Sequence, residues 1–347
     1  MGSAPPHPPP RVLVTGATGF IGAHVVDSLL QRGVRVRGAT RSLKKANLML
    51  QARPNHLSQL EFVQVGDFAE AASFDEAVKD VDGIIHVASP FSYAIKDNEK
   101  ELVLPAIQGV KSILQAAATN PNIKRVIITS SFASVLDIGR KSPPRFTYTA
   151  LDWNPLSYEE SVDPKTSPVI AYRGSKKYAE LEAWNFVKKH KPHFDIVTLC
   201  PPMTFGPVAH PISRPSELNE SNAGLWNIAN GKQLPVARVP FWIDVRDLAR
   251  AHVEALLRPD VGNRRFTVTA PERFSYGLAA DLIRRNFEWG HSRVVKTVDG
   301  QDTDDSYDLD GETAAKDLGL EYRTFEETVT SLISQVAEME AKTGTTS

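Results

Sequence analysis

The sequence predicts an α/β fold in which helices cover both faces of a doubly wound parallel sheet. Short runs rich in Val, Ile and Thr alternate with amphipathic stretches from residue 11 to about residue 203, a pattern typical of βαβ units. The apolar runs do not alternate strictly, as expected for strands buried on both faces. Three glycines, Gly16, Gly19 and Gly22, lie between the first run and the first amphipathic stretch.

The individual elements follow from the same patterns. Strands are expected at residues 11–15, 34–40, 60–65, 83–88, 125–130 and 195–201, and the clearest helices at residues 20–32, 99–119 and 171–190. After residue 201 the pattern changes, because residues 204–238 are rich in Pro, Ser, Asn and Gly, with one helix expected at 221–230. Residues 241–258 predict a strand end and a helix, and residues 264–269 another strand. Two helical stretches separated by an acidic loop at 299–310 are expected beyond residue 275.

The composition limits the class of protein. The chain has 347 residues, 41% hydrophobic and 23% charged, as is ordinary for a globular protein with a large core. Its formal charge of −1 gives no electrostatic case for a nucleic acid or an anionic membrane as partner, and no apolar run approaches the length of a membrane span. The single cysteine, Cys200, excludes an internal disulfide and fits a reducing compartment, so a cytoplasmic protein is expected. The nine histidines show no metal-ligand spacing, which predicts no metal.

The glycine-rich turn at residues 16–22 indicates a dinucleotide site. Gly16 allows a sharp turn, Gly19 lets the backbone approach a pyrophosphate, and Gly22 lets the helix pack closely on the strand. The free N–H groups at the start of that helix face an anion, so Thr18, Phe20 and Ile21 are expected beside the cofactor. A structural turn without a ligand is the alternative. Together with the alternating strands and helices, the turn predicts a Rossmann-type fold.

Basic residues after the second strand favour NADP over NAD. An acidic residue there would bind the ribose 2′-hydroxyl of NAD, but the strand end continues as Arg41-Ser42-Leu43-Lys44-Lys45. The planar guanidinium of Arg41 suits a 2′-phosphate, and Lys45 or Lys44 adds a positive charge. A solvated basic loop is the alternative interpretation.

The ends of the third and fourth strands supply further candidates for cofactor contacts. Asp67 is suited to accept a hydrogen bond from an adenine amino group, with Phe68 against the ring, although Asp67 is as well explained as a turn residue. Ala88 and Ser89 are small enough to let a nicotinamide ribose pass. His86 lies in an apolar run, which indicates a core histidine rather than a catalytic one.

Tyr172 and Lys176 carry the chemistry. They lie four residues apart at the start of a predicted helix, so the phenol and the ammonium share one face. A neighbouring cation lowers the pKa of a phenol from its ordinary value near 10, which suits it to proton transfer. Ser131 follows the fifth strand, where its hydroxyl can donate to a carbonyl oxygen; a turn or cap role is the alternative.

These segments together resemble the extended short-chain dehydrogenase/reductases. The resemblance is greatest to the dihydroflavonol reductase and cinnamoyl-CoA reductase group, and within it to fungal NADPH-dependent carbonyl and methylglyoxal/isovaleraldehyde reductases. It covers residues 11 to about 330. The segments that carry it are Val14–Gly22, Arg41-Ser42, His86–Pro90, Thr129–Ser131, Tyr172 with Lys176, and Asp244–Ala249.

The resemblance implies a role for each of these residues. Ser131 orients the substrate carbonyl, Tyr172 is the general acid, and Lys176 lowers its pKa and binds ribose. By the same resemblance, Arg41 and Lys45 contact the 2′-phosphate, Asp67 and Phe68 lie on the adenine side, and Pro201 lies beside the nicotinamide. The sequence departs from the family at Cys200-Pro201-Pro202-Met203, where Asn-Pro is common. The Asn-Trp-Tyr-Cys-Tyr signature of plant cinnamoyl-CoA reductases is absent, so a CoA thioester is not the expected substrate.

The expected activity is NADPH-dependent reduction of a ketone or aldehyde, with Tyr172 as proton donor. A hydrophobic or aromatic small-molecule carbonyl compound is favoured by the residues expected to line its pocket, which are Phe91, Tyr93, Phe132, Met203, Thr204 and Trp226. The alternatives are a nucleotide-sugar epimerase or dehydratase, a hydroxysteroid-type dehydrogenase, and a cofactor-sensing regulator without catalysis. Asp244 and Asp247 are expected to cap and pin the following helix.

The sequence also predicts how the chain is divided. A Rossmann domain that binds NADP is expected over residues 11–203, with residues 239–262 returning to it. A smaller substrate-binding lobe is expected from residues 204–238 and 263–347. Residues 1–10 are proline-rich, lack the apolar region of a signal peptide, and are expected to form a disordered tail. A monomer or a homodimer is expected.

Overall fold

The computed structural model describes residues 10–89, 95–140, 145–234, 237, 239–295 and 305–344. The expected tail therefore lies outside the described residues, except for Pro10. The first half of the predicted acidic loop at 299–310 also lies outside them.

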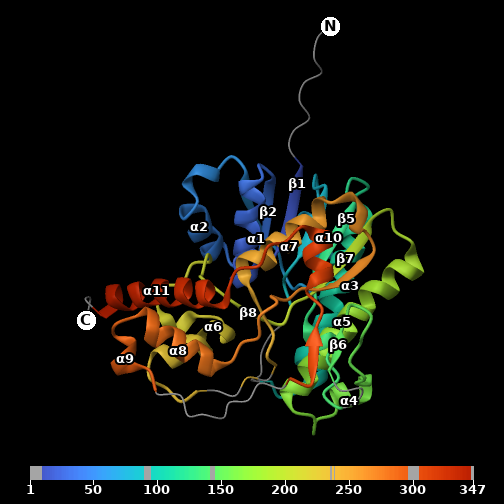
Figure 1. The fold of residues 1–347 in the computed structure, drawn as a ribbon. Helices are drawn as coiled ribbons and strands as arrows, with labels where there is room; N and C mark the ends of the chain where they lie inside the picture. The colour runs from blue at the N-terminus through green and yellow to red at the C-terminus, as the bar shows by residue number, and fades with distance from the viewer. Residues whose placement is uncertain are drawn as a thin grey trace.

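A seven-stranded parallel sheet forms the centre of the molecule (Figure 1), in the order β10-β7-β5-β4-β1-β2-β3. Its strands are β1 (Arg11–Thr15), β2 (Arg35–Thr40), β3 (Leu60–Gln64), β4 (Gly83–His86), β5 (Arg125–Thr129), β7 (Asp195–Cys200) and β10 (Arg264–Thr267). The strand order reverses between β1 and β4, and in such sheets ligands bind beyond the carboxyl ends of the strands at this point. Thr15 pairs with His86 across the reversal, so the two strands end together.

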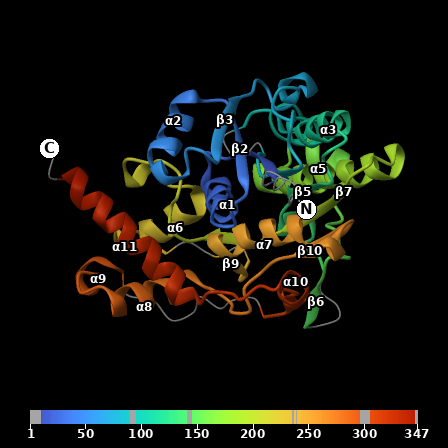
Figure 2. The ribbon, with the colours of Figure 1, turned by 90° about the horizontal axis from the view of Figure 1, so that it is seen from above.

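Helices pack on both faces of this sheet, as the sequence predicts. In Figure 2, α1 (Phe20–Gln31) and α7 (Val245–Leu257) lie on one side, and α3 (Leu104–Thr119) and α5 (Pro168–His190) on the other. Successive residues of β1 explain the lack of alternation in its sequence. Val14 packs into the core beneath α1 and α7, whereas Leu13 packs into the core beneath α3 and α5.

The stretch predicted as one helix at 99–119 begins as a π-helix, Glu99–Val103, and continues as α3. By length and composition alone, the whole Glu99–Thr119 stretch is apolar enough to span a membrane. However, 56% of its most apolar window is buried inside the protein, and α3 packs along α5. Its apolar character is therefore explained by its place in the core.

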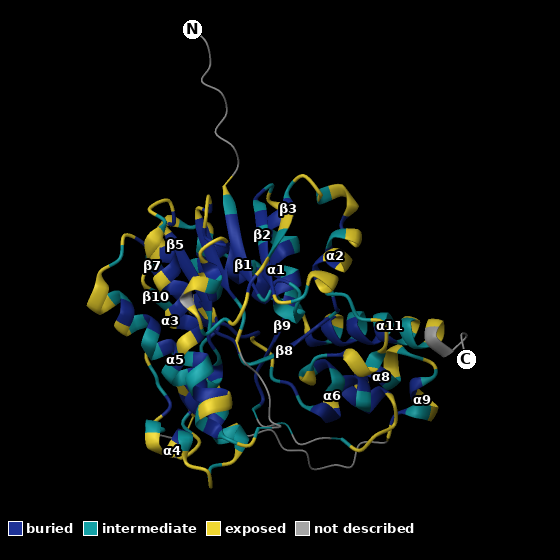
Figure 3. Cartoon of the chain, turned by 180° about the vertical axis from the view of Figure 1, so that it is seen from behind, coloured by how far each residue is buried: buried dark blue, intermediate teal, exposed yellow. Residues whose placement is uncertain are grey.

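The second part of the molecule is a cluster of helices beside the carboxyl ends of the strands (Figure 1). It contains α6 (Glu220–Ala229), α8 (Tyr276–Asn286), α9 (Gly290–Arg293) and α11 (Phe325–Gly344). A two-stranded parallel sheet, β8 (Met203–Phe205) with β9 (Trp242–Asp244), joins it to the first part. Its own core includes Phe205, Trp242, Phe274 and Phe325, and Figure 3 shows buried residues along α6 and α11 of this cluster.

Shorter elements complete the fold. They are α2 (Leu43–Gln51), α4 (Tyr158–Val162), α10 (Glu312–Leu318) and the parallel pair β6 (Phe146–Tyr148) with β11 (Tyr307–Leu309). The predicted strands and the main predicted helices agree with the structure to within a few residues at their ends.

The predicted division of the chain differs from the structure at residue 263. The sequence places β10 in the smaller lobe, but this strand pairs with β7 and forms one edge of the main sheet. Helix α10 also packs on β10 and α7. The chain therefore enters the helical cluster, returns to the sheet, and leaves it again.

Candidate active site

The glycine-rich turn has the geometry of an anion cradle. Gly16 has a φ of +66°, in the left-handed region that favours glycine, and its carbonyl oxygen accepts a hydrogen bond of 2.9 Å from the N–H of Gly19. A Cβ on Gly22 would lie 2.1 Å from that carbonyl oxygen, so a side chain there is sterically excluded. No side chain caps the start of helix α1, because its N-cap residue is Gly19. Its first N–H groups thus remain available to an anion.

The predicted adenosine residues gather beside this turn. Arg41 and Lys45 are exposed at the end of β2 and the start of α2. The Arg41 guanidinium lies 5.8 Å from the centroid of the Phe68 ring. Asp67 accepts a hydrogen bond of 2.9 Å from the N–H of Ala69 through one carboxylate oxygen, which is the turn role that the sequence left open. This wall therefore offers two cations and one aromatic ring.

The end of β4 closes against the glycine-rich turn. Ala88 donates a backbone hydrogen bond of 3.2 Å to the Thr15 hydroxyl, which lies 3.0 Å from Nδ1 of His86. A Cβ on Gly16 would lie 3.0 Å from the Ala88 nitrogen. Burial and the charge of Lys176 lower the pKa of His86 to about 3. His86 is therefore a neutral core residue, as predicted, while Ala88 and the exposed Ser89 lie at the sheet edge.

Ser131, Tyr172 and Lys176 come together beyond the ends of β5 and β7. Ser131 caps the short helix Phe132–Ser134 and accepts a hydrogen bond of 3.1 Å from the N–H of Ala133. Tyr172 lies in the first turns of α5, which is capped by Ser167. The ammonium of Lys176 lies 5.8 Å from the centroid of the Tyr172 ring. Ser131 and Tyr172 line the same cavity.

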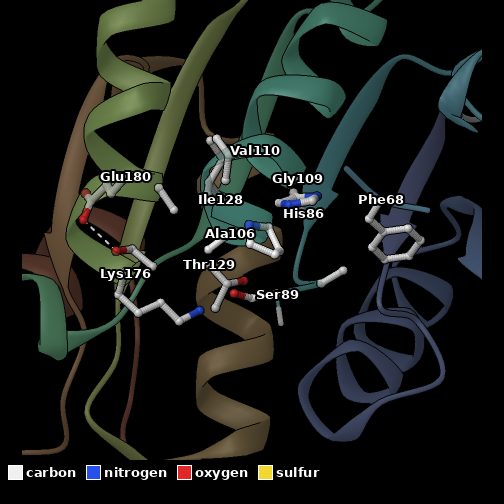
Figure 4. A pocket seen from close by; sticks show the side chains of 14 residues that line it. Phe68, His86, Ser89, Ala106, Gly109, Val110, Ile128, Thr129, Lys176 and Glu180 are labelled. Atoms are coloured by element: carbon white, nitrogen blue, oxygen red, sulfur yellow. Dashed lines mark hydrogen bonds between the residues drawn. The ribbon is translucent and has the colours of Figure 1, made fainter. Parts of the chain in front are cut away.

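Lys176 is buried, and burial lowers the pKa of its ammonium. Its ammonium lines a small cavity of about 30 Å³ together with Ser89, Thr129 and Glu180 (Figure 4). Burial lowers the pKa of Lys176 to about 8, and the carboxylate of Glu180, one turn further along α5, acts in the opposite direction. The ammonium therefore titrates much closer to neutral pH than an ordinary lysine does.

A large cavity of about 780 Å³ opens in front of Ser131 and Tyr172. Of the predicted substrate-binding residues, Phe132, Met203 and Thr204 line it. Phe91 and Tyr93 lie outside the described residues. Several lining residues were not predicted from the sequence and come from distant parts of the chain, among them Leu136, Val169, Asn219, Asn227, Val239 and Phe274.

Two predictions about individual residues need qualification. Trp226 is not among the residues that line the cavity; it is buried in the core of the helical cluster, where the guanidinium of Arg293 lies 5.3 Å from its ring centroid. The expectation that it contacts substrate is wrong, because this residue faces the core side of α6. Pro201 is buried, and its carbonyl oxygen accepts a hydrogen bond of 2.8 Å from Phe132, whereas the following Pro202 lines the cavity.

Other candidate groups have structural roles. Asp244 caps α7 and accepts hydrogen bonds of 2.7 Å from the N–H of Arg246 and from the Thr328 hydroxyl. Asp247 pairs with Arg323, so both carboxylates cap and pin as predicted. Burial raises the pKa of Cys200 to about 12, which disfavours a thiolate. Within the described ranges, His, Cys, Asp and Glu form no group suited to a metal ion.

Comparisons with known proteins agree with this geometry. The NAD dependent epimerase/dehydratase family matches residues 12–269. An oxidoreductase of Schizosaccharomyces pombe is 39% identical over 91% of this chain and 94% of its own. The ketoreductase azaE of Aspergillus niger is 33% identical over 94% and 98%.

A solved structure supports the same assignment. Yeast methylglyoxal/isovaleraldehyde reductase Gre2, complexed with NADPH, superposes with a TM-score of 0.86 at 30% identity, covering 96% of this chain and 99% of that one. The resemblance found in the sequence is therefore confirmed. The chain belongs to the NAD dependent epimerase/dehydratase family, the extended short-chain dehydrogenase/reductases, and its similarity to reductases extends over nearly its whole length.

Proposed function

We propose that this protein is an NADPH-dependent carbonyl reductase in which Tyr172 donates the proton. One observation carries the proposal. Ser131 and Tyr172 line one wall of a cavity of about 780 Å³ whose lining also includes Phe20 and Ile21 of the glycine-rich turn. Lys176 lies behind Tyr172, with its ammonium 5.8 Å from the ring centroid. The proton donor and the start of the helix that follows the glycines thus line one cavity, and the activating cation lies one helical turn from the proton donor.

The residues present fit a bound NADPH. The uncapped start of α1 leaves its first N–H groups available to a pyrophosphate at the turn. The exposed Arg41 and Lys45 would bind the 2′-phosphate, and Phe68, beside Arg41, would contact the adenine ring. No carboxylate follows β2, which argues against the NAD-specific epimerase alternative. Lys176, with Ala88, Ser89 and Pro201, would hold the nicotinamide end.

Each of the three catalytic residues has one task in the reaction. Bound NADPH supplies a hydride to the carbonyl carbon. The Ser131 hydroxyl donates a hydrogen bond to the carbonyl oxygen, and its own oxygen is held by the N–H of Ala133. Tyr172 gives its phenolic proton to the same oxygen, so that the carbonyl becomes an alcohol. The Lys176 ammonium stabilises the phenolate left behind until a proton from water restores it.

The cavity lining favours a hydrophobic or aromatic carbonyl substrate. Phe132, Leu136, Val169, Met203 and Phe274 form apolar surface near the catalytic wall. Its volume of about 780 Å³ falls in the range of roughly 300–1,000 Å³ that is typical of pockets for drug-sized ligands, which is more than a two- or three-carbon carbonyl compound needs. Polar side chains, including Asn219, Ser221 and Asn227, line other parts of it. We propose an aryl or branched-alkyl ketone or aldehyde.

An oxidation screen tests the proposal. NADPH consumption is followed by its absorbance with aliphatic aldehydes, diketones, aryl ketones and keto esters, with NADH in parallel. Turnover with NADPH on at least one class is expected, and Tyr172→Phe should lower kcat by roughly 10²–10⁴-fold while NADPH still binds. Unchanged turnover in Tyr172→Phe would refute the role of the phenol. Bound NAD in the purified protein, with no carbonyl reduction, would favour the epimerase alternative.

Location and assembly complete the proposal. Cys200, the single cysteine, is buried and unpaired, which fits a reducing compartment. We therefore place the enzyme in the cytoplasm, working as a monomer or a homodimer. Fractionation of cells and light scattering of the purified protein test the two statements separately.

A further inference from the structure

A buried carboxylate lies one helical turn beyond Lys176. The side chain of Glu180 is 1% exposed, and it is surrounded by donors. The hydroxyls of Ser130 and Thr198 donate to it at 2.6 and 2.7 Å, and Arg265 donates from Nε at 2.8 Å and from Nη2 at 3.2 Å. A carboxylate so far from water persists only when paired and hydrogen-bonded. The pKa of Glu180 is accordingly lowered, since these partners outweigh the cost of burial.

The partner of Glu180, Arg265, is also buried, and each nitrogen of its guanidinium donates a hydrogen bond. It lies on β10, is 7% exposed, and donates from Nη1 to the carbonyl oxygens of Ala150 (3.0 Å) and Asp152. Its guanidinium lies 3.7 Å from the centroid of the Trp153 ring. Arg265 therefore ties the edge strand of the sheet to both α5 and the segment at 150–153.

This pair touches the catalytic groups through two connections. Ser134, in the turn that Ser131 caps, accepts a hydrogen bond of 3.0 Å from Arg265. Its hydroxyl lies 2.8 Å from both the Glu180 carboxylate and the Ser131 carbonyl oxygen. Asn154, just beyond the segment held by Arg265, donates to the carbonyl oxygens of Ala133 (2.7 Å) and Arg173 (3.1 Å).

The second connection, through Asn154, joins the serine turn (residues 131–134) to the turn of α5 that carries Tyr172, because Arg173 directly follows Tyr172 in the chain. Tyr172, Lys176 and Glu180 lie four residues apart on one face of α5. The Ser131 turn and this face are thus held by one polar network, to which residues 130–134, residues 150–154, α5, β7 and β10 contribute.

We propose that Glu180 and Arg265 are positioning residues for the proposed reductase, holding Ser131 and Tyr172 in register and providing the charge balance around Lys176. Neither residue touches the large cavity, so both act through the catalytic groups. The proposal rests on the proposed function, because the alignment of Ser131 with Tyr172 matters only if Tyr172 donates the proton.

The charges around Lys176 give the proposal a measurable consequence, which is a shift in the pH dependence of kcat. The titratable groups that act on it are Tyr172 and Glu180 from α5, His86 from β4 and Cys200 from β7. His86 and Cys200 are neutral near pH 7, with pKa values of about 3 and about 12. Among these groups Glu180 supplies the negative charge, and Arg265 offsets part of it. A nearby negative charge raises the pKa of an ammonium and of a phenol alike.

The test measures the pH dependence of kcat in variants that change one charge at a time. We call the fall of kcat at high pH the alkaline limb of the profile. Replacing Glu180 by Gln removes the negative charge, so this limb should move to lower pH by about one unit or more. Arg265→Met leaves Glu180 without its partner, so the limb should move the opposite way. The double variant should lie between the two single variants. These directions hold whether Lys176 or Tyr172 produces the limb.

A matched control exists at the other end of the same strands. Arg125 and Asp195 form a similar pair, 2.5 Å apart, at the amino ends of β5 and β7. Asp195→Asn should lower the melting temperature and leave the pH profile unchanged. If Glu180→Gln behaves like this control, or if both single variants shift the limb in one direction, the pair is only structural and the proposal is overturned.

A second comparison keeps the test decisive where Glu180→Gln does not fold. Arg265→Lys keeps the charge but loses the forked contacts, so its alkaline limb should match the wild type while kcat falls and the KM for NADPH changes little. Equal limbs in Arg265→Lys and Arg265→Met would overturn the proposal. A wild-type protein that reduces no carbonyl would instead refute the proposed function, and the two failures are therefore distinguishable.

Discussion

The two ends of the proposed NADPH site are built differently. The adenosine end consists of a backbone turn and exposed side chains that lie close in sequence, with Gly16, Gly22 and Arg41 within one βαβ unit. The nicotinamide end consists of buried side chains from distant segments, joined by the network of Glu180 and Arg265. The first end is suited to holding charged phosphates in contact with water. The second is suited to proton transfer, since burial strengthens electrostatic interactions and shifts pKa values.

The largest effect is expected at the nicotinamide end. Ser131→Ala removes the hydroxyl that donates to the substrate oxygen, so kcat should fall by roughly 10²–10³-fold with the Kd for NADPH unchanged. Stopped-flow turnover and fluorescence titration measure the two quantities. Ser275→Ala makes the same chemical change at the cap of α8; it should cost about 1 kcal/mol of stability and leave kcat unaltered. Similar kcat values for both variants would contradict the role of Ser131.

A second substitution tests the backbone turn at the adenosine end. Gly22→Ala places a Cβ 2.1 Å from the Gly16 carbonyl oxygen, so NADPH binding should be lost and the free energy of unfolding should fall by about 1–3 kcal/mol. Gly33→Ala is the control, because Gly33 has a φ of +73°, but apart from its two chain neighbours no described residue has an atom within 4 Å of the place that a Cβ would occupy. That variant should lose about 1–2 kcal/mol and still bind NADPH. Retained binding in Gly22→Ala would refute the cradle.

Charge at the adenosine end gives a smaller effect, selective for one cofactor. Arg41→Ala should raise the KM for NADPH by roughly 10–100-fold, since a hydrogen bond to a charged group is worth about 1.5–3 kcal/mol, and should leave the KM for NADH nearly unchanged. The difference should shrink at high salt because Arg41 is exposed. Arg214→Ala removes another exposed arginine, far along the chain, and should affect neither cofactor. Equal changes for NADPH and NADH would remove the 2′-phosphate assignment.

Acid should weaken the nicotinamide end in particular. Nδ1 of His252 donates to the Leu248 carbonyl oxygen and Nε2 lies 2.7 Å from the Thr129 hydroxyl, and burial lowers the pKa of this histidine to about 4. The unfolded chain protonates it near pH 6.5, so between about pH 6.5 and 4 the unfolded state binds more protons. The free energy of unfolding should therefore fall with falling pH, by about 1.4 kcal/mol per pH unit for this residue.

Urea unfolding between pH 7 and pH 4.5 measures this slope. His252→Asn should flatten it by the contribution of one proton. An unchanged slope would show that His252 is not the group responsible.

The same contrast explains what the sequence predicts well. Gly16, Gly19 and Gly22 predict a phosphate-binding turn from the sequence alone, because the tight backbone and the glycines that allow it lie within one short segment of the chain. Tyr172 and Lys176 are recognisable for the same reason, since one helix turn sets their spacing. Glu180 continues that spacing by one more turn, and this was the available signal for it.

Other contacts had no local signal. Arg265 reaches Glu180 only because β10 pairs with β7, a pairing between segments far apart in the chain that no local pattern encodes. The wrong expectation for Trp226 has a similar origin, because a helix with apolar residues on several faces does not reveal which face meets substrate. The cavity-lining residues come from many separate segments. Tertiary packing rather than local pattern decides these positions.

Strand β10 has a consequence for how the protein is made. The nucleotide-binding elements are complete by Cys200, and a ribosome exposes them before residues 264–267 emerge. Until Arg265 arrives, Glu180 lacks its ion-pair partner, and Ser134, in the turn that Ser131 caps, lacks one of its hydrogen bonds. The main sheet is thus completed only after the segment between β7 and β10, which carries α6 and α7, has been made. A polypeptide ending near residue 262 should accordingly be prone to aggregation or degradation rather than persist as a half-enzyme.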